Sequence, residues 1–529
     1  MAIIISNVET EWFIEENEII DAALDRCALR WSDSLDSSVY NTEMHHDKDG
    51  KLKRISSVYV NLSNPDYEQT MADKFDFITL VMEEIPVTLP HNRKKAKIYV
   101  AGFGPAGMFA ALLLAECGYN PIVIDRGMDI DTRTSQVNDF LSSGLLSEKN
   151  NMKFGEGGGR VFQDTRLLSR IGDPFIYYIL RRMIQYGAPR SILSEAQPKI
   201  SSEAMKKIVK GIRYSIIDNG GEVRFGQQLT GIKVEEGKIR SVIINGKQEE
   251  KCDRLVLAFG QNATDMYRSL LTCGVVMSPR PYFIGIRVEH LRQDVDAAVY
   301  GDIIRSQKVK LPPAGYNLHS KIDGRDVFTY RVMGGGEVMP AHSNNDTIAV
   351  EGVLRNDVLS GITTSAICVS VDPSDFGGNS SDPLSGINFQ RKIEELARSA
   401  TRSNKAPATT VRGFLEGTAN LSDAAASSTY PIGVIPSNFV DIFPPFVITA
   451  FKKGLVDFSK KMKAFNNGKA MLTAPESRII PPVKIDRNPD YSIKDIENIF
   501  VCGECAGYSE GVLNAAVEGI KAAQGVAKS

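Results

Sequence analysis

The stretch KIYVAGFGPAGMFAALLLAECGYNPIVIDRG, Lys97 to Gly127, decides the fold of this chain. Ile98 to Ala101 is short and apolar, which is typical of a buried parallel strand, and a glycine-rich turn follows it directly. An apolar helical pattern comes next, and Pro121 to Ile124 has the character of a second strand. The stretch therefore predicts the βαβ unit of a Rossmann-like α/β fold.

The glycines of the turn have the spacing GxGxxG. Gly102 permits the tight turn, Gly104 lets backbone N–H groups approach a pyrophosphate, and Gly107 lets the helix lie close to the strand. Pro105 and Ala106 begin the helix, whose positive end favours phosphate. This arrangement predicts a dinucleotide site.

An acidic residue supports the same prediction. GxGxxG alone is a weak signal, but Asp125 follows the second strand and lies 23 positions after Gly102. An acid about 20 residues after the first glycine binds the ribose hydroxyls of a dinucleotide. The strand, glycines, helix, second strand and acid together indicate nucleotide binding far more strongly than the glycines do.

The length, charge and apolar segments of the chain narrow the classes of function that it can have. The chain has 529 residues and a mass of 58.1 kDa, which favours two or three domains. A formal charge of -2 gives no electrostatic reason to expect nucleic acid or an acidic membrane as a partner. The N-terminus has no basic region of a secretory signal, and the apolar run Phe109 to Ala115 is too short to span a bilayer. We therefore expect a cytoplasmic protein.

The seven cysteines are few and scattered, as in a reducing compartment. Cys502 and Cys505 form a CxxC, for which a redox pair is one interpretation. Because they flank a predicted cofactor turn, we expect structural cysteines instead. No group of His, Cys, Asp and Glu has metal-ligand spacing, so no metal is expected.

Four segments organise the chain. Residues 1–93 have the pattern of a small α+β domain, and a protein partner is one role for it. Residues 94–277 form the first part of the Rossmann-like domain, 278–471 an inserted α+β substrate or cap domain, and 472–529 the C-terminal part. Buried-strand character returns at Ile499 to Cys502, so we expect both ends of this region to close one sheet.

Several blocks of the chain carry a family resemblance. They are GFGPAGMFAALLLAECGY, DTRTSQV, FGEGGGRVFQD, YFIGIRVEH, PESRIIPPV and GECAGYSEGVLNAAVEGIKAA, in that order from about Lys95 to the C-terminus. In these blocks the chain resembles the FAD-binding oxidoreductases with a glutathione-reductase-like flavin domain, and most closely the uncharacterized FAD-dependent dehydrogenases. The small N-terminal domain is also similar to one that members of this family carry.

The resemblance implies contacts with FAD. The glycines of the first turn would hold the pyrophosphate, Asp125 the adenosine ribose with Arg126 beside it, and the backbone of Leu229 the adenine. Gly260 would end the strand that crosses the nucleotide, and Glu504 would bond the ribityl chain. The remaining residues implied at the diphosphate and the flavin are Arg133, Gly155, Glu156, Gly157, Gly158, Gly503, Gly511, Val512 and Asn514.

Two departures from the family pattern change the expectation. The block GEGGGRVFQDTR stands where members more often have GEGGAGTFSDGK, so Arg160 and Gln163 place different side chains near the pocket. The turn YRVMGGGEV, Tyr330 to Val338, lacks the cysteine that such members tend to have before it. Any chemistry that depends on that cysteine would be absent here.

The C-terminal helix has a physical role in the flavin interpretation. The positive end of the helix from about Val512 would stabilise negative charge on the pyrimidine side of a reduced flavin, by about 0.3–2 kcal/mol. The sequence has no second GxGxxG unit of the kind that usually binds NAD(P)H. The later glycines, Gly334 to Gly336, lack the strand, helix and distal acid of such a unit. NAD(P)H would therefore bind only transiently, as a reductant.

Catalytic residues are the least determined part. His342 is a candidate acid or base, and Arg287, Arg331 and Arg478 are candidates to clamp a carboxylate substrate. Each of the four is also explained by an ordinary structural role. The favoured function is an FAD-dependent dehydrogenase that transfers a hydride between FAD and a small organic substrate. The alternatives are a flavin-holding binding or regulatory protein and an NAD(P)H-dependent flavin monooxygenase.

Overall fold

A computed structural model describes residues 2–47, 49, 51–81, 86–90, 96–149, 151–167, 173–301, 311–354, 360–378, 381–466 and 468–529. Its contacts divide the chain into two compact units. The first comprises Met1–Val87 with Arg166–Ile200, and the second comprises Thr88–Thr165 with Ser201–Ser529. The boundary expected between residues 93 and 94 lies outside the described residues.

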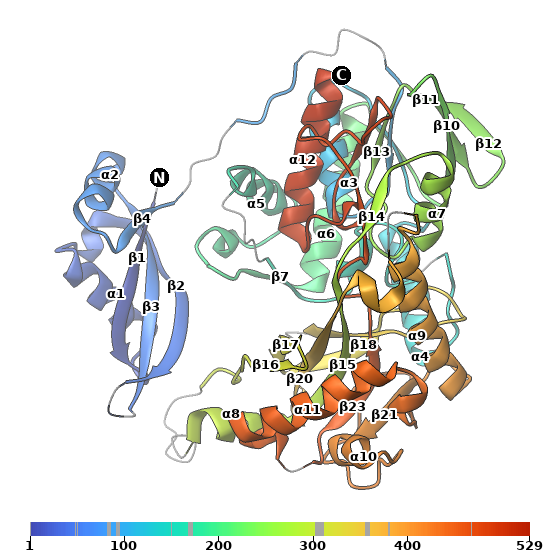
Figure 1. The fold of residues 1–529 in the computed structure, drawn as a ribbon. Coiled ribbons are helices and arrows are strands. Elements are labelled where there is room, and N and C mark those ends of the chain that lie inside the picture. Colours follow the sequence, from blue (N-terminus) through green and yellow to red (C-terminus); the bar gives the residue numbers. More distant parts are fainter. Residues whose placement is uncertain are drawn as a thin grey trace. The chain divides into compact units, whose positions relative to one another are not determined.

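The first unit is built on a βαββαβ pattern. Its elements are β1 (Ile3–Glu11), α1 (Glu16–Arg26), β2 (Ser34–His46), β3 (Leu52–Leu62), α2 (Pro65–Lys74) and β4 (Ile78–Leu80). The strands form an antiparallel sheet in the order β2-β3-β1-β4, which is the ferredoxin-like arrangement (Figure 1). Alternate strand residues such as Ile3, Ile5, Val58 and Val60 are buried with Leu24 of α1. The α and β elements expected in this region are present.

A segment from later in the sequence completes this unit. It contains α5 (Phe175–Gln185), the 3-10 helix η3 (Arg190–Leu193) and β8 (Lys199–Ile200). The Ala196 N–H donates to the carbonyl oxygen of Tyr40 at 2.8 Å, and Ser38 Oγ donates to the Ser194 carbonyl at 3.5 Å. The segment therefore lies along β2, although it interrupts the second unit in sequence.

The centre of the second unit is a parallel five-stranded sheet. The order is β25 (Ile499–Val501), β13 (Arg254–Leu257), β5 (Ile98–Ala101), β6 (Ile122–Ile124) and β9 (Glu222–Arg224). Every neighbouring pair is parallel. The strands expected near residues 98, 122, 254 and 499 are thus confirmed, and a strand from the C-terminal end completes the sheet beside β13. The chain adds β6 and β9 on one side of β5 and later adds β13 and β25 on the other side. The carboxyl end of β5 is therefore a topological switch point, the place at which α/β sheets bind their ligands.

Three helices pack against this sheet and one another: α3 (Pro105–Glu116), α6 (Ser202–Asp218) and α12 (Val512–Lys528). Figure 1 shows α3 and α12 adjacent. A Cβ on Gly519 of α12 would lie only 2.1 Å from the carbonyl oxygen of Ala106. The first and last parts of the second unit therefore meet at van der Waals distance, and glycine is required where they cross.

The stretch Gly220 to Ile232 contributes to two strands. It forms the end strand β9 and the start of β10 (Leu229–Glu235), with a break at Gly226, whose φ is +67°. The break exists because Gly226 N–H donates to the Gly127 carbonyl and Gln227 N–H to the Asp125 carbonyl. Strand β10 then pairs with β11 (Lys238–Ile244), and β11 pairs with β12 (Gln248–Lys251), in a separate antiparallel sheet.

A larger sheet forms the rest of the second unit. Its seven strands, in spatial order, are β16 (His319–Ile322), β17 (Arg325–Gly334), β20 (Ile362–Val371), β15 (Tyr282–Leu291), β23 (Met471–Glu476), β21 (Ala406–Thr410) and β22 (Val434–Pro436). All neighbours are antiparallel except β21 and β22. The flanking helices are α8 (Arg292–Tyr300), α9 (Ser385–Thr401), α10 (Val411–Glu416) and α11 (Pro445–Lys461). We call this region the cap. It also carries the hairpin β18 (Gly336–Pro340) and β19 (Val350–Leu354).

Candidate functional site

The glycine turn after β5 has the geometry that its spacing predicts. Gly102 has φ +107°, and a Cβ there would lie 2.3 Å from the Ala258 carbonyl oxygen. A Cβ on Gly107 would lie 1.9 Å from the Gly102 carbonyl oxygen, so α3 begins directly against the turn. At Gly104 the nearest atom to an added Cβ is 3.8 Å away, so space remains beside the start of α3.

A cavity opens at the carboxyl ends of four parallel strands. Residues following β5, β6, β13 and β25 border it, as expected at the switch point of an α/β sheet. Of the residues expected at the cofactor, those that border it are Gly102, Gly104, Pro105, Ala106, Asp125, Arg126, Gly155, Gly158, Leu229, Gly260, Gly503, Glu504, Gly511 and Val512.

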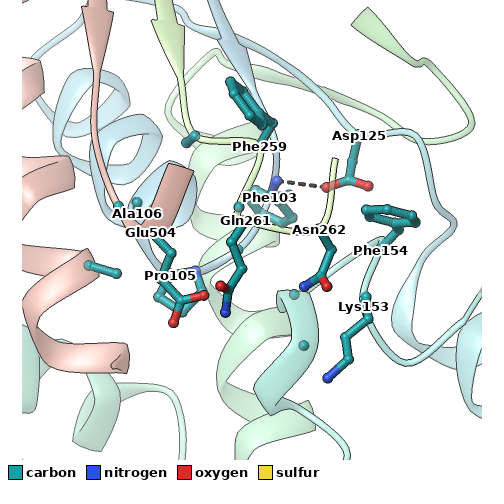
Figure 2. Close-up of a pocket in the computed structure, with 18 of the residues that line it drawn as sticks. Phe103, Pro105, Ala106, Asp125, Lys153, Phe154, Phe259, Gln261, Asn262 and Glu504 are labelled. Atoms are coloured by element: carbon teal, nitrogen blue, oxygen red, sulfur yellow. Dashed lines mark hydrogen bonds between the residues drawn. The ribbon is translucent and has the colours of Figure 1, made fainter. Parts of the chain in front are cut away.

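Asp125 is fixed at one side of this cavity. One carboxylate oxygen accepts from the Phe103 N–H at 2.7 Å and the other from the Gly127 N–H at 2.9 Å. The side chain is nearly buried but still borders the cavity. In the view of Figure 2, Glu504 lies across the cavity from Asp125, with Gln261 and Asn262 between them. The two acids thus mark opposite ends of an elongated site.

Other predicted cofactor residues lie behind the cavity wall. Arg133 is fully buried and donates through Nη2 to the carbonyls of Asn151 and Gly158, at 3.0 and 3.1 Å, and through Nη1 to the carbonyl of Glu156. Burial lowers the pKa of Arg133 to about 10. Its guanidinium therefore holds the loop that contains Gly157 in place.

The Glu156 side chain is also buried behind the wall. Its carboxylate accepts from the Ile130 N–H at 2.8 Å and lies 3.3 Å from Arg213 Nε. Burial raises its pKa. Gly107 and Asn514 do not border the cavity either, and the Asn514 amide donates to the Glu510 carbonyl at 2.9 Å. These residues shape the site from outside it.

The second glycine turn brings the C-terminal helix to the cavity. Gly503 has φ +78°, and a Cβ there would lie 2.8 Å from the Cβ of Ala106. Gly511, with φ +88°, is the N-cap of α12, and both it and Val512 border the cavity. No side chain caps the N-terminus of α12 or of α3. The positive ends of two helices therefore face one cavity with backbone N–H groups available to a ligand.

Cys502 and Cys505 are buried free thiols. Burial raises the pKa of Cys505 to about 12 and that of Cys502 well above its ordinary value. The Cys505 Sγ lies 3.2 Å from the Cys502 carbonyl oxygen and 3.6 Å from that of Leu257. Neither thiol borders the cavity, and protonated buried thiols are poor nucleophiles. This geometry supports the structural role expected from the sequence.

The catalytic candidates from the sequence lie mostly elsewhere. His342 is buried against Phe140, and burial lowers its pKa to about 3. Arg287 forms a fully buried two-pronged ion pair with Glu476, with both N–O distances 2.7 Å. These groups do not border the cavity. They stay without a functional assignment.

Arg331 also lies outside the cavity wall and pairs with Glu510 at 2.9 Å. Arg478 does border the cavity, but its guanidinium is engaged by Glu394 at 2.7 and 2.9 Å. It also donates to Asn262 Oδ1 at 2.9 Å. All three arginines singled out in the sequence are thus neutralised by carboxylates.

The cavity has polar residues that sequence reasoning missed. Lys153 and Glu351 form an ion pair at 2.5 Å, with side chains 7% and 11% exposed. Both border the cavity, as do Arg160, Gln261 and Asn262. Lys153 and Glu351 are 198 positions apart, so no local signal links them. Arg160 was marked only as a departure from the family pattern.

Helices of the described residues include none with the length and apolar character needed to cross a membrane. The parallel sheet, the two glycine turns and the uncapped starts of α3 and α12 are features that the class of dinucleotide-binding flavoproteins has at its cofactor site. The residues present fit FAD. Gly104 leaves the space beside the start of α3 open for a phosphate, and Gly102 and Gly503 allow close packing of the two turns that a larger side chain would prevent. Comparison with known proteins narrows this class to a family.

Residues 281–479, which contain the cap sheet, match the family described as "FAD-dependent protein, C-terminal domain-like". The chain is 36% identical over 433 residues to an uncharacterized protein of Clostridium beijerinckii, a match that covers 81% of this chain and 80% of that protein. The chain belongs to the same family as that protein, a family of FAD-dependent proteins, and FAD is its cofactor.

Solved structures show weaker likeness. A mutant of the halogenase PltM in complex with FAD is 10% identical, with a TM-score of 0.36, over 82% of this chain and 70% of that one. A geranylgeranyl bacteriochlorophyll reductase-like protein of Thermoplasma acidophilum is 13% identical, with a TM-score of 0.35, over 82% and 78%. These scores are low, and the fold assignment rests on the strand order of the sheet itself.

Proposed function

We propose that the protein is an FAD-dependent dehydrogenase that exchanges a hydride between FAD and a small organic substrate. The observation that carries the proposal is the composition of the cavity wall. One side consists of the two glycine turns and the starts of α3 and α12, and the other side includes Glu351 of the cap and Arg478, which follows the cap strand β23. A cavity bordered by both the cofactor turns and the cap would bring a second reactant against the cofactor.

The residues of the sheet side would hold the cofactor. The N–H groups at the start of α3 would face the pyrophosphate, Asp125 would accept from the adenosine ribose, and Glu504 would accept from the ribityl chain. The start of α12 would lie at the pyrimidine side of the flavin, which would supply hydride chemistry when bound. We assign no second nucleotide domain, so NAD(P)H would serve as a transient reductant.

Proton transfer would fall to the buried pair of Lys153 and Glu351. Burial lowers the pKa of Lys153, against the opposing effect of the Glu351 charge. Burial also opposes ionisation of Glu351, but the charges of Lys153 and Arg160 outweigh it and hold the pKa of Glu351 below its ordinary value. Lys153 Nζ is therefore the atom that we propose donates a proton to the substrate when the substrate is reduced by hydride, and that accepts a proton from it in the reverse oxidation.

The test is an anaerobic electron-transfer experiment on the purified, FAD-loaded protein. NADH and NADPH are each mixed with it, the flavin absorbance is followed, and the reduced protein is then offered a panel of ketones, enones, imines and quinones. Reduction of the flavin and its reoxidation by at least one organic acceptor are expected. A protein that retains FAD but whose flavin neither accepts a hydride nor passes one to any acceptor would contradict the dehydrogenase proposal and favour the binding role. Hydroxylated product in air would instead indicate a monooxygenase.

A further inference from the structure

The cations that border the cavity differ in how they are neutralised. Lys153 is paired with Glu351, and Arg478 is paired with Glu394. Arg126 lies 2.9 Å from Asp265 at the Asp125 end. Among the described residues, no carboxylate lies within ion-pair distance of the Arg160 guanidinium, and no hydrogen-bond acceptor is engaged by it. Arg160 therefore brings to the wall a positive charge that no ion pair or hydrogen bond of the described residues engages.

The surroundings of Arg160 place it on the cap side. It ends the 3-10 helix η2 (Gly158–Arg160), on the loop whose carbonyls Arg133 holds. Its charge acts on Glu351 of β19, on Lys153 and on Tyr330 of β17. Two of these three groups belong to the cap. The pyrophosphate, in contrast, is expected at the N–H groups of α3, which need no additional cation.

We propose that Arg160 binds an anionic substrate through a carboxylate of the compound that the flavin oxidises or reduces. This inference rests on the proposed function for the position of the flavin, and it adds the class of substrate. Arginine matches a carboxylate with two parallel N–H donors. Gln261 and Asn262, which also border the cavity, would complete the polar wall around such a ligand.

An anionic group at Arg160 has two sources. It is either a substrate carboxylate, as proposed, or a phosphate of FAD. The position of Arg160 favours the carboxylate. Its charge acts on Glu351 and Tyr330 of the cap, whereas the pyrophosphate is expected at the start of α3. The other cations that border the cavity are already paired with carboxylates. The experiment separates the sources by measuring FAD retention and carboxylate binding independently.

Calorimetric and flavin-absorbance titrations of the FAD-loaded protein would use benzoate and succinate as probes, with benzamide and succinamide as neutral counterparts. At least one carboxylate is expected to bind saturably, and its amide to bind at least about tenfold more weakly. Arg160→Met should weaken carboxylate binding by about 10- to 100-fold while FAD content stays at the wild-type level. Arg160→Lys should recover part of the loss, because the charge returns without the two-pronged geometry.

The matched control is Arg240→Met, which removes an exposed arginine of β11 whose nearest carboxylates lie 3.7 Å away. It should leave carboxylate binding unchanged. The proposal is overturned if neither carboxylate binds the wild-type protein, if Arg160→Met binds them as tightly as wild type, or if Arg160→Met loses FAD, which would make the arginine a phosphate ligand. Carboxylate binding that depends on Arg160 in a protein whose flavin never exchanges electrons would support this inference and defeat the dehydrogenase proposal.

Discussion

Gly104→Asp tests the cofactor site by charge alone. Gly104 has φ −83° and ψ −175°, a conformation open to any residue, and the nearest atom to an added Cβ is the Gly158 Cα at 3.8 Å. An aspartate therefore fits without a clash and places its carboxylate beside the start of α3. At about 4 Å and an effective dielectric constant near 20, its repulsion from a phosphate charge is about 4 kcal/mol.

That free energy corresponds to about a thousandfold weaker FAD binding. The assay is fluorescence titration of the apoprotein with FAD, together with the thermal unfolding midpoint of the apoprotein. Gly104→Asn is the matched control, since it has the same size without the charge. We expect Gly104→Asp to purify without flavin and to fold as stably as the control. Equal FAD affinity in the two variants would refute the placement of the pyrophosphate.

Three further predictions concern stability and the thiols. Gly107→Ala should lower the free energy of unfolding by about 1–3 kcal/mol, because its Cβ meets a backbone carbonyl at 1.9 Å; Gly361→Ala, which meets nothing within 4 Å, is the control in urea unfolding, and equal losses would contradict the reasoning. Cys505→Ser should leave FAD content and flavin reduction unchanged, and loss of turnover with FAD retained would restore a redox role for the CxxC. Burial lowers the pKa of His290 to about 4 and of His342 to about 3, so the unfolded chain binds protons below about pH 6.5 that the folded chain does not. The free energy of unfolding should therefore fall from about pH 6.5 toward pH 4, by up to about 1.4 kcal/mol per pH unit for each histidine. His342→Gln should reduce that slope in unfolding measured at pH 7 and pH 5, and an unchanged slope would exclude the contribution.

Much of the sheet could be predicted because its signals are local. The strand Ile98–Ala101 was expected at the bounds that the structure has, and α12 starts at Val512 as expected. Asp125, which the spacing after Gly102 singled out, follows β6 and borders the cavity. Residue period and glycine spacing are properties of a short segment, and a buried strand followed by a tight turn has few alternative structures.

The polar side of the cavity could not be predicted in this way. The sequence suggested Arg287 and Arg331, but long-range pairing with Glu476 and Glu510 neutralises both outside the cavity wall. Which arginine keeps an unpaired charge depends on which carboxylates the folded cap brings near it. Such contacts join residues far apart in the chain, so the periodicity of a local segment does not predict them.

The sequence by itself determined the βαβ unit, the glycine turns and the acid that follows β6, because each is set by backbone geometry within about thirty residues. Only the tertiary structure decided that Lys153 meets Glu351 and that Arg160 has no ion-pair partner among the described residues at the cavity. It also decided that Arg166–Ile200 joins the N-terminal unit. The physical reason is that ion pairing and burial depend on distance in space, which the fold sets through contacts between distant segments.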